Sequence, residues 1–71
     1  MRDVDLTIEP VELYKILKFE GMASSGAEAK NVIAAGLVTV NGEVELRKRK
    51  KIVSGDVIEF AGEQLRARLA P

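Results

Sequence analysis

The stretch SSGAEAKNVIAAGLVTVNGEVEL, residues 24–46, carries the signals that decide the fold. Ser25 followed three positions later by Glu28 fits a capping box, in which two side chains satisfy free backbone N–H groups at a helix start. Gly36 can supply the left-handed residue that ends the helix. The residues between them that recur at helical spacing are apolar: Ala29, Val32 and Ile33. The pattern therefore predicts a helix between Ser25 and Gly36 with that stripe buried.

The same stretch then predicts a β-hairpin. Asn41-Gly42 is the preferred pair for a two-residue type I′ turn, and apolar-rich segments flank it on both sides. After the turn, glutamates alternate with apolar residues: Glu43 and Glu45 with Val44 and Leu46. We expect the glutamates to face water and the apolar residues to face the core. Hairpin geometry explains Asn41 and Gly42 without a functional role.

Toward the N-terminus, the pattern predicts another helix and a short strand. Pro10 suits the first position of a helix, and Gly21 can end it. The apolar face of this helix comprises Leu13, Ile16 and Leu17. Lys15 and Lys18 project from the opposite side. Residues 4–7 alternate weakly and predict a short edge strand.

Toward the C-terminus, the pattern predicts two more strands. Gly55-Asp56 marks a turn ahead of a strand in which Ile58 and Phe60 share one face. A second turn precedes a strand with alternating inward residues: Leu65, Ala67 and Leu69. Its outward residues are Gln64, Arg66 and Arg68. The element order predicts an α+β fold with two helices packed on a small antiparallel sheet of three to five short strands. We expect residues 1–71 to form one domain.

Composition argues against several classes of function. The 71 residues include no Cys and no His, which argues against thiolate metal sites and His-activated nucleophiles. Ser24 and Ser25 are therefore interpreted as capping residues, and we expect no catalysis, metal, cofactor or small-molecule substrate. The N-terminal residues lack the apolar core of a signal peptide, and no run approaches the ~20 apolar residues of a membrane span. These features favour a cytoplasmic protein without membrane contact. We also expect a monomer.

Five consecutive cations follow the hairpin: Arg47, Lys48, Arg49, Lys50 and Lys51. The chain carries 11 basic and 11 acidic residues, so the remainder has six basic against 11 acidic residues, a net charge of −5. If extended, the run spans ~17 Å at about 3.4 Å per residue, enough to follow several phosphates. Five like charges also repel one another, and a bound polyanion would offset that repulsion. The run therefore predicts one face that attracts a polyanion.

The order of these signals resembles the alpha-L RNA-binding motif, the small domain named after ribosomal small-subunit protein four. The match covers about residues 10–60, at these positions: Leu13 to Leu17, Ser25, Ala29-Lys30 with Ile33, Gly36, Val38 with Val40, Asn41-Gly42 and Gly55-Asp56. The short chain and its basic run look like the small stand-alone bacterial members. The resemblance implies non-catalytic binding of structured RNA, often ribosomal RNA, and hence a place in translation.

The resemblance also sets the candidate RNA contacts, all of which are basic: Lys15, Lys18, Lys30, Arg47, Lys48, Arg49, Lys50 and Lys51. The family places a basic residue at Lys30, on the helix that faces RNA. Gly26 departs from the pattern, since many members carry Arg there; exposed N–H groups at the helix start could still receive an anion. Tyr14 and the two Phe do not form an aromatic stacking platform, which favours recognition of phosphates and shape in a duplex or junction.

Two alternatives remain open. The protein could instead be an interaction module whose basic loop binds an acidic, translation-related protein. A salt titration separates the two readings, because phosphate contacts give a steep dependence on ionic strength. Two other arginines, Arg66 and Arg68, share an outward strand face, and we expect them to pair across the sheet with Glu59 or Glu43.

Overall fold

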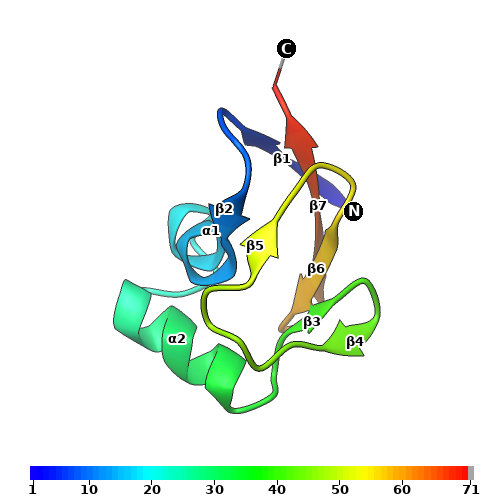
Figure 1. Cartoon of the computed structure of the whole chain (residues 1–71). Coiled ribbons are helices and arrows are strands. Elements are labelled where there is room, and N and C mark those ends of the chain that lie inside the picture. Colours follow the sequence, from blue (N-terminus) through cyan, green and yellow to red (C-terminus); the bar gives the residue numbers. More distant parts are fainter. Residues whose placement is uncertain (71) are drawn as a thin grey trace.

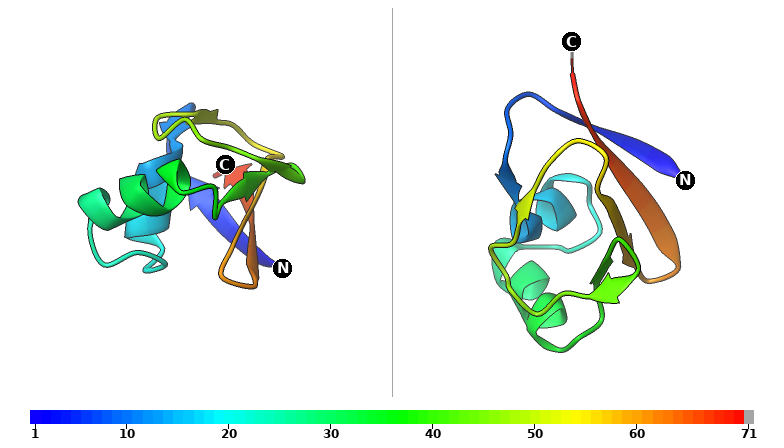
Figure 2. Two further views of the ribbon diagram at one scale, coloured as in Figure 1. Left: turned by 90° about the horizontal axis from the view of Figure 1, so that it is seen from below. Right: turned by 45° about the vertical axis from the view of Figure 1, so that its right-hand side comes forward.

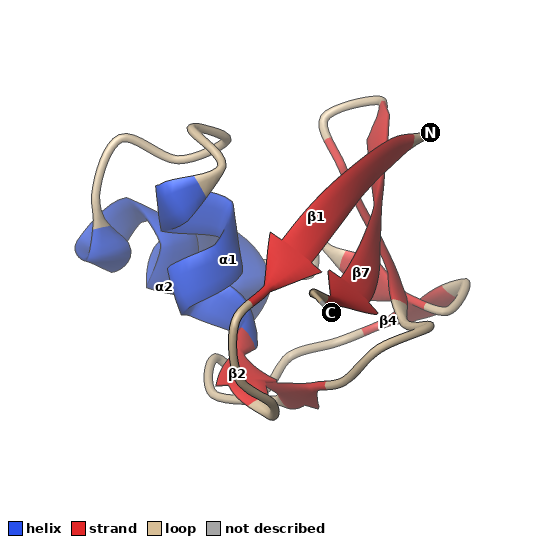
Figure 3. Ribbon diagram, turned by 90° about the horizontal axis from the view of Figure 1, so that it is seen from above, coloured by secondary structure: helices blue, strands red, loops and turns tan. Residues whose placement is uncertain are grey.

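The computed structural model describes residues 1–70, with the helices gathered on one side of the strands (Figure 1). The elements follow the chain in this order: β1 Arg2–Leu6, β2 Val11–Glu12, α1 Leu13–Phe19, α2 Gly26–Ala34, β3 Thr39–Val40, β4 Glu43–Val44, β5 Lys51–Ile52, β6 Val57–Phe60 and β7 Glu63–Leu69. The view from above separates the same two groups, helices in blue and strands in red (Figure 3). This arrangement confirms the predicted α+β class.

Five strands form one sheet in the order β1-β7-β6-β3-β4, and β2 pairs separately with β5. The predicted edge strand is β1, which pairs with β7 in the register Val4↔Ala67. This pair is parallel, whereas β7–β6, β6–β3 and β3–β4 are antiparallel. The larger sheet is therefore mixed rather than purely antiparallel, because the first and last strands run in the same direction.

The core lies between the helices and the larger sheet. Its fully buried large side chains are Leu13, Leu17, Ile33, Val38, Ile52, Ile58 and Leu65. Both predicted helical stripes contribute to it, although Val32 is only partly buried. Leu69, predicted to face inward, is 42 % exposed because it ends the last strand. Within residues 1–70, neither helix is long and apolar enough to cross a membrane.

The first helix begins later than predicted. Residues Val11 and Glu12 are extended rather than helical, because they pair with Ile52 and Lys51 of β5. The helix α1 therefore starts at Leu13, and Pro10 lies outside it. Its end is as predicted, since Gly21 follows the last turn with φ +74°.

The second helix confirms half of the predicted capping box. The Ser25 hydroxyl accepts a hydrogen bond from Glu28 N at 3.1 Å. The Glu28 carboxylate, however, accepts from Ser24, through its backbone N–H at 3.1 Å and its hydroxyl, rather than from the Ser25 N–H. These hydrogen bonds from Ser24 lower the pKa of Glu28 below its usual value. Gly36 has φ +80° just after the helix, as predicted.

The hairpin has the predicted turn, but the side chains of its second strand point in the opposite directions from those predicted. Asn41 and Gly42 both have positive φ, 53° and 85°, as a type I′ turn requires. Val44 and Leu46, predicted to be buried, are each 59 % exposed. Glu43 lies directly opposite the buried Val40, and directly opposed residues point to the same face of a sheet. Val44 therefore points away from the core.

The arginines of β7 pair across the sheet, with partners other than those predicted. The Arg66 Nε atom lies 3.2 Å from Asp3 Oδ1, and Arg68 Nη2 lies 3.1 Å from Asp5 Oδ1. The expected partners Glu59 and Glu43 were wrong. The reason is the parallel register, which places Asp3 beside Arg66 and Asp5 beside Arg68.

Candidate nucleic-acid interface

The cation run, residues 47–51, is called the basic loop below, and it is not extended. Lys50 N donates to Arg47 O at 3.2 Å, which closes a turn with Lys48 and Arg49 at its corner. Lys51 is the first residue of β5 and lies opposite Glu12 of β2 in the strand pairing. The predicted reach of ~17 Å is therefore wrong. The loop presents a compact group of cations.

Backbone hydrogen bonds fix the basic loop to the start of α1. Leu13 N donates to Lys50 O at 2.9 Å, and Tyr14 N donates to Lys48 O at 3.2 Å. The first N–H groups of a helix have no partner within the helix, and no side chain caps α1. The loop carbonyls take the place of that cap. The loop passes beside both helices in Figure 1 and in the right-hand view of Figure 2.

The ring of Tyr14 brings three of the predicted cations together. Lys30 Nζ lies 4.6 Å from the ring centroid, and Lys15 Nζ and Arg49 Cζ each lie 5.9 Å from it. These separations fall within the range of cation–π attraction. The residues come from α1, α2 and the basic loop. We call this group the Tyr14 cluster: Tyr14, Lys15, Lys30 and Arg49.

Two carboxylates lie among these cations. Glu12 contacts Lys15 Nζ at 3.1 Å and Arg49 Nε at 3.8 Å, so it joins two members of the Tyr14 cluster. Glu45 accepts from Arg47 Nε at 2.9 Å, from Nη2 at 3.2 Å and from the backbone N at 3.0 Å. The side-chain hydrogen bond from Arg47 holds the pKa of Glu45 below its ordinary value and raises that of Arg47. The positive charge of Arg47 is thus already paired with the carboxylate of Glu45.

The other predicted cations have different surroundings. Among residues 1–70, no carboxylate lies within ion-pair distance of these lysines: Lys18, Lys30, Lys48, Lys50 and Lys51. Lys48 and Lys51 are exposed, and Lys50 is half-buried. Lys18 does not join the Tyr14 cluster, because its Nζ lies over the Phe19 ring at 5.8 Å from the centroid.

The start of α2 is a poorer anion site than predicted. Ser25 accepts from the Glu28 N–H, which removes one free donor. The ionised Glu28 carboxylate lies at the same helix end, next to Ser24. Its negative charge opposes a phosphate there, so the Tyr14 cluster and the basic loop remain as the places where an anion would be attracted.

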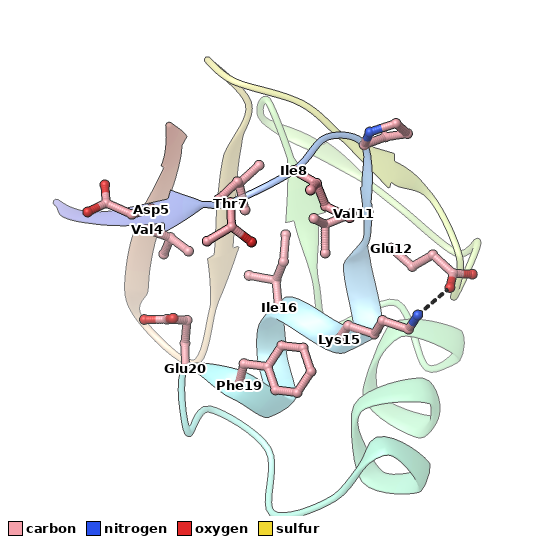
Figure 4. Close-up of a pocket in the computed structure, with 12 residues that line it drawn as sticks. Val4, Asp5, Thr7, Ile8, Val11, Glu12, Lys15, Ile16, Phe19 and Glu20 are labelled. Carbon is pink, nitrogen blue, oxygen red and sulfur yellow. Dashed lines mark ion pairs between the residues drawn. The ribbon is translucent and has the colours of Figure 1, made fainter. Parts of the chain in front are cut away.

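A groove of about 430 Å³ lies beside α1, under the segment that joins β1 to β2 (Figure 4). Ile8 and Phe19 are 69 % and 70 % exposed, and Ile16 lies between them in the view. The Glu12–Lys15 ion pair lies at its rim. No group of His, Cys, Asp or Glu within residues 1–70 is arranged to hold a metal ion. Most of the residues that line the groove are apolar.

Sequence reasoning did not identify Tyr14 as part of the site. Tyr14 lies next to the buried Leu13 on α1, so the pattern gives it only a place beside the core. Its neighbours Lys30 and Arg49 are distant in sequence, and no local spacing connects them. The one available signal was indirect: an aromatic residue among lysines on the first helix.

Known proteins with similar sequences and structures are consistent with this architecture. The model of the S4 domain family matches residues 4–67. The Escherichia coli protein named "Putative RNA-binding protein YbcJ" is 54 % identical over 55 residues, covering 78 % of this chain and 79 % of that protein. The solution structure of E. coli YbcJ, reported to contain an alpha-L motif involved in RNA binding, superposes with a TM-score of 0.73. That match has 48 % identity and covers 96 % of this chain and 87 % of YbcJ.

A ribosomal protein shares the same fold. The crystal structure of 30S ribosomal protein S4e from Thermoplasma acidophilum superposes with a TM-score of 0.69 and 32 % identity. The match covers 83 % of this chain but only 31 % of S4e. The fold described above therefore corresponds to one part of that longer protein.

Proposed function

Because this chain belongs to the S4 domain family, whose model matches residues 4–67, we propose that it is a non-catalytic RNA-binding protein. The interface proposed is the Tyr14 cluster together with the basic loop. The RNA-binding description of the E. coli relative and the alpha-L motif of its structure support this proposal. The target is structured RNA, a duplex or junction of the kind found in ribosomal RNA.

The observation that carries the proposal is the meeting of Lys30 from α2 and Arg49 from the basic loop on one aromatic ring. Residues outside the basic loop comprise six basic and 11 acidic side chains, so most of the surface repels a polyanion. Because the cations are concentrated on one face, RNA would bind to this protein in one orientation, with that face toward the phosphates. The arginines can form forked contacts with phosphate, and the lysines act as point charges.

The compact shape of the basic loop favours a folded RNA over a single strand. Its turn places cations close together instead of along one extended backbone. Tyr14 already lies against three cations, so it is not a free stacking surface for a base. Recognition of phosphates and helical shape fits this surface better than readout of unpaired bases.

A pair of charge-matched variants tests the proposal. We expect Lys30→Gln with Arg49→Gln to weaken binding to a fluorescently labelled RNA stem-loop by roughly tenfold or more, because two phosphate contacts are lost. The control, Arg66→Gln with Arg68→Gln, removes two positive charges from β7, outside the proposed interface. We expect the control to change the dissociation constant by less than about threefold, since distant exposed charges are screened. Equal losses in both variants would contradict the proposed interface.

A salt titration of the same complex distinguishes RNA binding from the alternative hypothesis, in which the basic loop binds an acidic protein. Four to five phosphate contacts should lower the affinity by about four log units per tenfold increase in salt. The control variant should keep that slope. A slope near zero, together with capture of an acidic protein from nuclease-treated extract, would favour the interaction module instead.

A further inference from the structure

We propose that Tyr14 is a positioning residue, whose ring holds Lys30, Lys15 and Arg49 in one arrangement before RNA arrives. This inference rests on the proposed function. The three cations come from separate segments and would otherwise repel one another. The Tyr14 ring lies within 6 Å of all three, and its face attracts positive charge.

Glu12 cannot fill this role alone. Its carboxylate lies 3.1 Å from Lys15 Nζ and 3.8 Å from Arg49 Nε, which explains part of their placement. Lys30 has no ion pair with any carboxylate in residues 1–70, and its Nζ lies 4.6 Å from the Tyr14 ring centroid. Lys30 therefore depends on Tyr14 more than the other two cations do.

Tyr14 is itself held in place from three sides. Its backbone N donates to Lys48 O at 3.2 Å, and its half-buried side chain packs against the core. On the side of α2, Gly26 lies so close that an added Cβ would be 3.7 Å from the ring atom Cε2. The ring therefore lies at the junction of α1, α2 and the basic loop. Because the ring is held in place there, it can hold in place one cation from each of these three segments.

Positioning matters because lysine and arginine side chains lose freedom when they bind. Holding a long side chain in its bound arrangement beforehand reduces the cost of ordering it, which corresponds to roughly a two- to tenfold gain in affinity per side chain. The hydroxyl of Tyr14 makes no hydrogen bond to another residue in the described part of the chain. The ring alone should supply the effect, and Phe should replace Tyr.

The first test needs no RNA. In the NMR spectrum of the free protein, we expect the Lys30 side-chain protons next to Nζ to be shifted upfield by the Tyr14 ring current. Those of Lys51, which has no aromatic ring within cation–π distance in residues 1–70, serve as the reference. Tyr14→Phe should keep the shift. Lys30 protons that match those of Lys51 would overturn the proposal, even if RNA binding were intact.

The second test uses RNA affinity. We expect Tyr14→Leu to weaken binding to the stem-loop by roughly five- to tenfold, while Tyr14→Phe stays within about twofold of the original protein. In the Lys30→Gln background, Tyr14→Leu should cause a much smaller further loss, because it acts mainly through Lys30. A Phe variant as weak as the Leu variant would overturn the proposal, since it would mean that the hydroxyl contacts RNA. Fully additive losses would overturn it as well.

The two proposals can fail separately. If Lys30→Gln with Arg49→Gln leaves RNA affinity unchanged, the proposed interface is wrong whatever the ring-current shift shows. If that variant loses affinity but Tyr14→Leu does not, the interface stands and the positioning role is wrong. Thermal unfolding of each variant confirms that the affinities compare folded proteins.

Discussion

Asn41 joins two turns that lie far apart in the sequence. Besides its turn conformation, its side chain accepts from Val57 N at 2.9 Å and donates to Asp56 Oδ1 at 3.0 Å. Asp56 in turn accepts from Val53 N at 3.0 Å. The Asn-Gly and Gly-Asp signals are therefore parts of one hydrogen-bonded unit. Hairpin geometry alone was an incomplete explanation of Asn41.

A glycine at this position separates the two roles of Asn41. Gly adopts positive φ without strain, so Asn41→Gly keeps the turn but removes both side-chain hydrogen bonds. We expect a loss of about 1–3 kcal/mol in the free energy of unfolding, measured by urea denaturation, because Val57 N–H loses its partner. A loss near zero would mean that only the turn conformation matters. Asn41→Ala should lose more, since Ala also strains the turn.

At the level of elements, the helix α2 was the best predicted part of the chain. Ala29 and Ile33 of its predicted stripe are buried, Ser25 caps its start and Gly36 follows its end, as predicted, because each signal depends on residues within one or two turns. The second half of the capping box was not, because Ser24 offers two donors to the same carboxylate. Local spacing could not decide between two neighbouring serines.

Substitution of Ile33 tests how much α2 contributes to the stability of the core. Its side chain is fully buried. We expect Ile33→Ala to lower the free energy of unfolding by about 2–5 kcal/mol through the cavity that it leaves. Val32→Ala on the same helix is the comparison, and it should cost less because Val32 is only partly buried. Similar losses at both positions would contradict the described packing.

The pKa of Glu28 links the stability of α2 to pH. Because the pKa is lowered in the folded protein, Glu28 contributes stability that is present above its ordinary value of 4.5 and is lost as pH falls through the lower, folded value. We expect Glu28→Gln to remove this contribution. Stability measured at pH 7 and at pH 3 should therefore change less in the variant. An unchanged difference would show that other carboxylates account for the acid sensitivity.

The facing of the hairpin could have been derived from the sequence, whereas the start of α1 could not. A two-residue turn at Asn41-Gly42 places Val40 opposite Glu43, so a buried Val40 requires that Val44 point away. By contrast, the extended form of Val11 and Glu12 depends on pairing with β5, which is distant in the chain. The partner of such a short strand is set by tertiary structure.

At the scale of the whole molecule, charge is distributed unevenly over the fold. One edge of the sheet, formed by β1 and β7, carries arginines already paired with aspartates. The other side, formed by the helices and the basic loop, carries the lysines that lack an ion pair within residues 1–70. The sequence predicted that Arg66 and Arg68 would be paired, although with other partners, and it did not predict that Lys15 and Arg49 would form ion pairs with Glu12. It did not predict that Arg47 would lie with Glu45, since an exposed pair so near in sequence has no distinct pattern.

The hydrogen bonds from Leu13 and Tyr14 to the carbonyls of Lys50 and Lys48 limit how this protein could be engineered or could diverge. Exposed loops ordinarily accept added or deleted residues. Here a single added glycine between Arg47 and Lys51 would shift the acceptors out of register with the helix. These contacts are made by backbone groups, so they place no limit on the side chains of the loop, but they fix its length relative to α1.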